Sequence, residues 1–243
     1  MAMLVIWIFL SWPSLAAEAA SETTKAVIAS ATPYATEVYI VKADKAGPTV
    51  MVVGGIHGNE PSGYLTAAKM KDYEIKKGTL IVIPEANKKA IKINKRAAPG
   101  DLDLNRCFPQ SQSQKAGNEL AAAIYNAARN NSVDWVIDLH EGYDYFSSQS
   151  SNSVGQSIIY QPDKETRKMA EAMLKNINGT IRDKNKKFTV LRYPVKGSLA
   201  RSAADNLNAK AMIVETCTKS GMYTRNKYHQ IAVDTLLNRL NMK

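Results

Sequence analysis

The feature that most constrains this fold is an alternation between short apolar runs and segments with helical spacing. The runs at residues 49–53, 80–83, 135–139 and 211–214 are almost wholly apolar, as is typical of strands buried on both faces of a sheet. Further strands are predicted at residues 37–41, 157–160 and 188–191, and helices at 62–73, 116–129, 164–177, 198–207 and 228–240. This order predicts an α/β fold, a three-layer αβα sandwich around a mixed, largely parallel sheet.

The chain of 243 residues, 45% of them hydrophobic, is long enough for one domain with a sizeable core. We expect this domain to span residues 36–243. Residues 20–35 are mostly small or polar, which predicts a flexible lead-in.

The N-terminal residues 1–19 predict a secretory signal peptide. Their apolar stretch is too short to span a bilayer comfortably and is followed by small residues, although no Lys or Arg precedes it. The alternative is an uncleaved membrane anchor. We therefore expect a secreted or extracytoplasmic protein that meets the membrane only through this segment.

The net charge of +10 is spread along the chain and accompanies no motif that reads bases or phosphates. We therefore expect no nucleic-acid partner. A positive field would instead attract anionic substrates, or hold the protein near an anionic cell wall or membrane.

Two of the three histidines follow predicted strands directly. His57 lies in the run GGIHGNE, three residues before Glu60, and His140 ends the strand at residues 135–139. Ligand sites in α/β folds gather at the carboxyl ends of strands, and a catalytic zinc takes three protein ligands with one open position. This pattern predicts one zinc ion per chain, bound by these three residues. The alternative for each histidine is an ordinary buried residue.

Other polar residues fit around such a centre. Asp138 shares a strand face with His140 and would support it, whereas His229 is expected to be structural. Asn105 and Arg106 suit a substrate carboxylate, or Arg106 makes a surface salt bridge. Glu215 ends an apolar strand, where a carboxylate serves as a general base or belongs to a structural ion pair.

Cys107 and Cys217 lie close in sequence to Arg106 and Glu215 respectively. A secreted chain can pair such cysteines in a disulfide. Two separate buried thiols are an equally good expectation.

In their order, these motifs resemble the succinylglutamate desuccinylase/aspartoacylase family, within the zinc carboxypeptidase-like superfamily. The resemblance covers residues 54–217 and rests on HGNE, DLNRCF, DLH and the late glutamate at position 215. It implies a zinc carboxypeptidase-like fold in which His57, Glu60 and His140 are the metal ligands and Glu215 is the general base.

The resemblance also implies roles for the basic and aromatic residues. Arg106 and Asn105 match residues that hold the substrate carboxylate, and Arg96 matches an arginine that polarises the scissile carbonyl. Tyr193 matches a mobile substrate-binding tyrosine of the peptidase branch, and Arg201 an additional carboxylate ligand of the deacylase branch.

The sequence thus predicts a zinc metallohydrolase that cleaves an amide bond in a small molecule or peptide with a free carboxylate. It is either an N-acyl amino acid deacylase or a carboxypeptidase, and the signal peptide favours an extracytoplasmic peptide or cell-wall substrate. One alternative is a non-catalytic carboxylate- or peptide-binding module on the same fold, in which a metal-ligand residue or the general base should be missing. Another is a cationic surface-binding protein.

Overall fold

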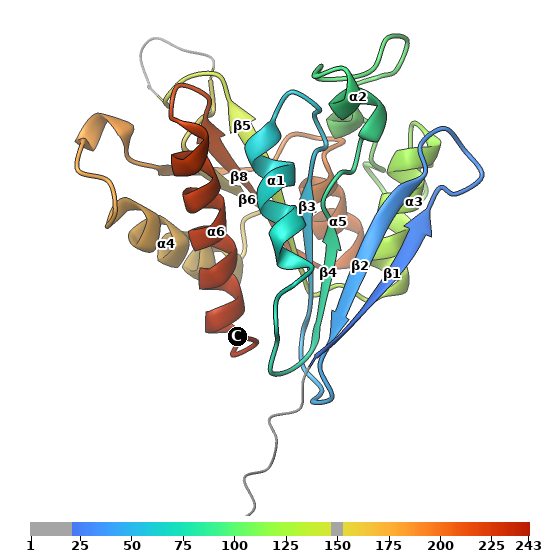
Figure 1. Ribbon diagram of the computed structural model, residues 1–243, viewed down its shortest axis with the longest axis horizontal. Coiled ribbons are helices and arrows are strands. Elements are labelled where there is room, and N and C mark those ends of the chain that lie inside the picture. The colour runs from blue at the N-terminus through green and yellow to red at the C-terminus, as the bar shows by residue number, and fades with distance from the viewer. Residues whose placement is uncertain (1–20, 147–152) are drawn as a thin grey trace, which may run out of the picture.

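The computed structural model describes residues 21–146 and 153–243, which form one mixed sheet with helices on both faces (Figure 1). The predicted signal peptide at residues 1–19 lies outside the described residues. None of the described helices has the length and apolar character needed to cross a bilayer.

The sheet contains eight strands within the described ranges, in the order β1-β2-β4-β3-β5-β8-β6-β7. They are β1 (Glu22–Ile28), β2 (Thr36–Lys42), β3 (Thr49–Gly54), β4 (Thr79–Ile83), β5 (Trp135–Gly142), β6 (Ser157–Tyr160), β7 (Thr189–Arg192) and β8 (Lys210–Cys217). The central strands β4, β3, β5 and β8 are parallel, whereas β2 and β6 join them antiparallel. This arrangement confirms the predicted fold class.

The helices form two layers, one on each face of the sheet. They are α1 (Pro61–Met70), α2 (Lys88–Lys92), α3 (Glu119–Asn130), α4 (Lys164–Asn178), α5 (Leu199–Leu207) and α6 (Met222–Arg239). Helices α1, α4 and α6 cover one face, and α3 and α5 cover the other (Figure 1).

The hydrophobic core consists of two buried clusters, one under each helix layer. Alternate residues of a strand enter different clusters, so Val136 of β5 packs on the side of α3 and α5, and Ile137 on the side of α1, α4 and α6. The same alternation sends His140 toward the first side and Glu141 toward the second.

The predicted flexible lead-in at residues 20–35 is wrong for Glu22–Ile28, which form the edge strand β1. This strand pairs with β2 along its whole length, from Glu22 opposite Lys42 to Ile28 opposite Thr36. Its side chains are nearly all exposed, so the sequence carries no apolar alternation to reveal it.

The last helix also begins earlier than predicted, at Met222 rather than at residue 228. The segment from Met222 to Lys227 is largely polar and shows no apolar spacing in the sequence. One of its polar residues, Arg225, nevertheless faces inward and pairs with a buried carboxylate.

Candidate metal centre and active site

His57 and Glu60 come from the turn that connects β3 to α1. Gly55 has a φ of 74°, a left-handed conformation that glycine adopts without strain. The turn then brings His57 Nδ1 to 2.7 Å from Glu60 Oε1, and both side chains are buried. Glu60 is also the residue from which helix α1 begins.

His140 reaches the same point from β5, next to β3 in the sheet. Its Nδ1 lies 2.8 Å from Glu60 Oε2 and 3.2 Å from His57 Nδ1. The potential ligand atoms of the three residues all lie within 4.8 Å of one another. The structure therefore brings together the three residues that the sequence singled out as metal ligands.

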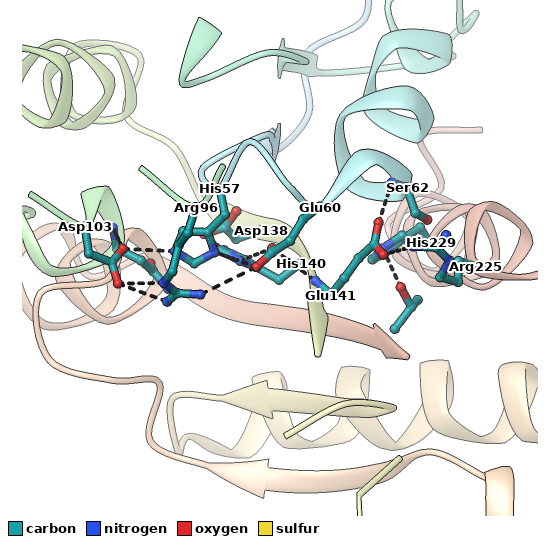
Figure 2. A network of polar contacts seen from close by, with 12 residues as sticks. His57, Glu60, Ser62, Arg96, Asp103, Asp138, His140, Glu141, Arg225 and His229 are labelled. Carbon is teal, nitrogen blue, oxygen red and sulfur yellow. Dashed lines mark hydrogen bonds and ion pairs between the residues drawn. The ribbon is translucent and has the colours of Figure 1, made fainter. Parts of the chain in front are cut away.

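Each histidine has a carboxylate behind it, at the ring nitrogen that faces away from the cluster (Figure 2). Asp103 Oδ1 lies 2.9 Å from His57 Nε2, and Asp138 Oδ2 lies 3.0 Å from His140 Nε2. The hydrogen bond to Asp103 favours a proton on His57 Nε2, which leaves the Nδ1 lone pair free for an ion. At His140 the carboxylate of Asp138 forms an ion pair with Nε2. With the carboxylate of Glu60, this donor set fits a zinc ion.

The pKa values of Glu60, His57 and His140 depend strongly on one another. Burial would raise the pKa of Glu60, but His140 and His57 lower it to about 2. Burial would lower the pKa of His140, but Asp138 and Glu60 raise it well above its ordinary value. The pKa of His57 is raised in the same way by Glu60 and Asp103. Negative groups thus surround two imidazoles that attract a proton or a cation.

Glu215 lies beside the cluster on β8, directly opposite His140 in the strand register. Its carboxyl group is buried, and this burial raises its pKa to about 7. A cation among the neighbouring ligands would pull this value down. Glu215 can therefore accept and return a proton near neutral pH.

The cluster opens onto a cavity of about 680 Å³, a size suited to a small ligand. Its lining includes Asn105, Arg106 and Tyr193 as well as His57, Glu60 and Glu215. Asn105 is buried, and its side-chain oxygen has no hydrogen-bond partner among the described residues.

Arg96 also lines this cavity and reaches the cluster through Asp103. Its Nε and Nη2 donate to Asp103 Oδ2 at 3.1 and 2.9 Å, and its Nη1 lies 3.7 Å from Glu60 Oε1. The guanidinium group is therefore beside the proposed ligands.

The structure does not place Arg201 in the cavity. Its Nε donates to Asp205 Oδ2 at 2.6 Å within α5, and its guanidinium carbon lies 5.5 Å from the centre of the Tyr193 ring. Tyr193 itself is exposed, lines the cavity and has a φ of 63°, which is uncommon for a residue with a side chain.

The comparison with known families agrees with this geometry. Residues 46–215 match the catalytic domain of the succinylglutamate desuccinylase/aspartoacylase family. The chain belongs to this family. The match contains the three ligand candidates and ends at Glu215.

One relative indicates how much of the chain the sequence similarity covers. The N-alpha-acetyl-L-2,4-diaminobutyric acid deacetylase of Halomonas elongata is 32% identical over 100 residues, which are 40% of this chain and 29% of that protein.

Two solved structures share the fold. The mDAP-bound D,L-carboxypeptidase Csd4 of Helicobacter pylori has a TM-score of 0.70 at 21% identity, over 81% of this chain and 52% of that one. A succinylglutamate desuccinylase/aspartoacylase of Rhodobacter sphaeroides has a TM-score of 0.68 at 17% identity, over 92% and 66%. The chain thus spans about half the length of Csd4.

Sequence reasoning missed two residues of this family member's site, Asp103 and Glu141. Asp103 begins the quoted DLNR motif, and its acidic side chain was the available signal. Glu141 directly follows His140 and also lines the cavity, while its carboxylate contacts Ser62 of α1 and Arg225 of α6. The contact between Glu141 and Arg225, which are far apart in the sequence, is revealed only by the three-dimensional structure.

The two cysteines and the third histidine that the sequence singled out are all buried. Cys107 and Cys217 are both buried free thiols, so the disulfide considered for them is not formed. His229 is fully buried, and burial lowers its pKa to about 3. Its Nε2 lies 3.2 Å from the hydroxyl of Thr216, on the opposite face of β8 from Glu215.

Proposed function

We propose that this protein is a zinc-dependent hydrolase that cleaves an amide bond in a substrate with a free carboxylate. One zinc ion per chain would be held by His57, Glu60 and His140. The observation that carries the proposal is the convergence of these ligand atoms, each imidazole backed by a carboxylate, at a cavity that also contains Glu215.

The zinc ion, Glu215 and Arg96 would each have a distinct role in the reaction. Zinc, when bound, supplies the Lewis acidity that makes a water acidic near neutral pH and polarises a carbonyl. The carboxylate of Glu215 takes a proton from the attacking water and returns it to the leaving amine. The guanidinium group of Arg96 stabilises negative charge on the scissile carbonyl oxygen.

Asn105 and Arg106 hold the carboxylate of the substrate. Both line the cavity, and Arg106 Nη1 is oriented by donating to the backbone oxygen of Asn105 at 2.8 Å. The planar guanidinium suits a carboxylate, and fixing that end of the substrate would hold the reacting bond near Glu215. Tyr193, which also lines the cavity, would contact the substrate.

The substrate is an N-acyl amino acid or the carboxyl end of a peptide. The similar proteins include a deacetylase of an acetylated amino acid and a D,L-carboxypeptidase crystallised with mDAP and with a tripeptide. Two exposed tyrosines at the cavity, Tyr143 and Tyr193, favour the larger substrate because they offer ring surface beyond the reacting centre.

The proposed setting is extracytoplasmic, after cleavage of a signal peptide within residues 1–19. The apolar stretch in this segment and the small residues that follow it support the proposal. N-terminal sequencing of the protein from fractionated cells tests it. An intact N-terminus on a cytoplasmic protein would overturn it.

The deciding experiment compares zinc content and activity in the purified wild type, His57→Ala and His229→Asn. We expect about one zinc per chain in the wild type and in His229→Asn, and none in His57→Ala. Activity toward a panel of N-acyl amino acids and short peptides should follow zinc content. A wild type that stays free of zinc after incubation with the metal would overturn the proposal and favour a non-catalytic binding module.

A further inference from the structure

Glu141 is a buried carboxylate that the proposed chemistry does not use. It follows His140 on β5, so its side chain points to the opposite face of the sheet, between α1 and α6. Its side chain is 0% exposed. A carboxylate in such surroundings requires partners that offset the loss of its hydration.

Those partners come from two helices that are far apart in the sequence (Figure 2). Glu141 Oε1 accepts a hydrogen bond from the backbone nitrogen of Ser62 at 2.5 Å, at the start of α1. Glu141 Oε2 pairs with Arg225 Nη1, in the first turn of α6. The carboxylate therefore connects β5 with both helices.

Helix α1 lacks a capping side chain of its own. Its N-cap residue is Glu60, whose side chain makes no cap hydrogen bond. Both oxygens of Glu60 are engaged elsewhere, since Oε1 contacts His57, while Oε2 contacts His140 and accepts from the backbone nitrogen of Glu141 at 3.1 Å.

The carboxylate of Glu141 supplies the hydrogen-bond acceptor at the start of α1 that the side chain of Glu60 does not provide. The first backbone N–H groups of a helix need partners, and a negative charge at that end also interacts favourably with the helix dipole. The start of α1 is close-packed as well, because an added Cβ at Gly63 would lie 2.3 Å from the backbone oxygen of Leu139. Any displacement of this turn would move the adjoining Glu60.

We propose that Glu141, held by Arg225, is a positioning residue that fixes the start of α1 and thereby places Glu60 at the metal centre. This inference rests on the proposed zinc site. It extends that site to a residue of the last helix, and it predicts that zinc affinity depends on an ion pair that does not touch the metal.

The test measures zinc affinity by chelator competition, at a temperature where circular dichroism shows every variant to be folded. The variants are Glu141→Ala, Glu141→Gln and Arg225→Lys. We expect Glu141→Ala to weaken zinc binding about tenfold, in the range found for groups that orient metal ligands. Glu141→Gln should lose less, since its amide oxygen still accepts from Ser62. Arg225→Lys should lose little because the positive charge remains.

Asp163→Ala is the matched control. Asp163 caps α4 by accepting from the backbone nitrogens of Glu165 and Thr166 at 2.8 and 3.0 Å. Its loss should lower the melting temperature in the same manner as the loss of Glu141, but should leave zinc affinity unchanged.

Wild-type zinc affinity in both Glu141 variants, with only the melting temperature reduced, would overturn the inference. If Glu141→Ala does not fold, wild-type affinity in Glu141→Gln has the same meaning. A wild type that binds no zinc would overturn the proposed function and this inference together, whereas unchanged variants of a zinc-binding wild type overturn the inference alone.

Discussion

His140 and Glu215 are register partners on the adjacent parallel strands β5 and β8. Their side chains therefore leave the same face of the sheet side by side. One residue further along, Glu141 and Thr216 are partners on the opposite face. The two strands thus place the proposed chemistry on one side and its structural support on the other, and this separation allows the two roles to be tested independently.

Glu215→Gln should abolish most turnover while the protein keeps its zinc. The amide has nearly the shape of the carboxylate but cannot accept the proton, a function worth about 10²- to 10⁴-fold in rate. The measurement is kcat together with zinc content for the wild type and the variant. The exposed Glu171→Gln on α4 provides the control, and near-normal turnover in Glu215→Gln would refute the general-base role.

Asp103→Asn should weaken zinc binding about 10- to 100-fold, because His57 Nε2 loses the carboxylate that fixes its orientation. The short helices η1 (Leu104–Arg106) and η2 (Lys184–Lys186) provide a matched pair. Asp103 caps the first and Asp183 caps the second, each through the backbone nitrogen two residues on. Asp183→Asn should therefore leave zinc affinity unchanged. Equal affinities in the two variants would show that Asp103 has only its capping role.

Zinc affinity should rise with pH. The pKa values of His57 and His140 are raised, so the metal-free protein retains protons on these imidazoles at pH values where free histidine has lost them. Zinc must displace those protons, and less displacement is needed as the pH increases. Chelator competition from about pH 6 to about pH 8 measures the slope, and titration calorimetry in two buffers counts the released protons. Affinity that does not change across this range would contradict the expectation.

Arg106→Met should raise the KM for a carboxylate substrate by about 10- to 100-fold, as expected for a lost hydrogen bond to a charged group. The same substrate with its carboxylate converted to an amide should lose much less. Arg129→Met, on the surface of α3, is the control for removal of a positive charge. A uniform loss for both substrates would indicate that Arg106 does not bind the carboxylate.

Gly63→Ala should destabilise the protein by about 1–3 kcal/mol, as in overpacked cores. Its new methyl group would meet the backbone oxygen of Leu139 at 2.3 Å, and backbone cannot move aside easily. Gly221→Ala is the comparison, because an added Cβ there meets no atom of the described part of the chain within 4 Å. Urea denaturation gives both values, and equal stabilities would show that the first turn of α1 is more adaptable than its packing indicates.

The sequence predicted the sheet and the ligand cluster because both depend on local patterns. Buried strands such as β3 and β5 are continuous apolar runs, and polar residues at their carboxyl ends must meet at one edge of a parallel sheet. His57 and His140 could therefore be brought together without coordinates.

Features that depend on contacts between residues far apart in the sequence, or on strands with exposed side chains, could not be predicted from local patterns. Strand β1 pairs with β2 along its whole length, but its exposed side chains show no apolar alternation that would predict it. The pairing of Glu141 with Arg225 joins residues 84 positions apart, and a polar helix start looks the same whether it faces solvent or a buried carboxylate. Arg201 likewise could not be assigned before the structure showed its pairing with Asp205.

The position of β8 has a consequence for the synthesis of the protein. It is the last described strand along the chain, yet it lies between β5 and β6 in the sheet. A nascent chain without residues 210–217 holds two pieces of sheet that cannot join, each with an open edge. Because the same residues include Glu215, the sheet and the cavity beside it are completed in a single late event.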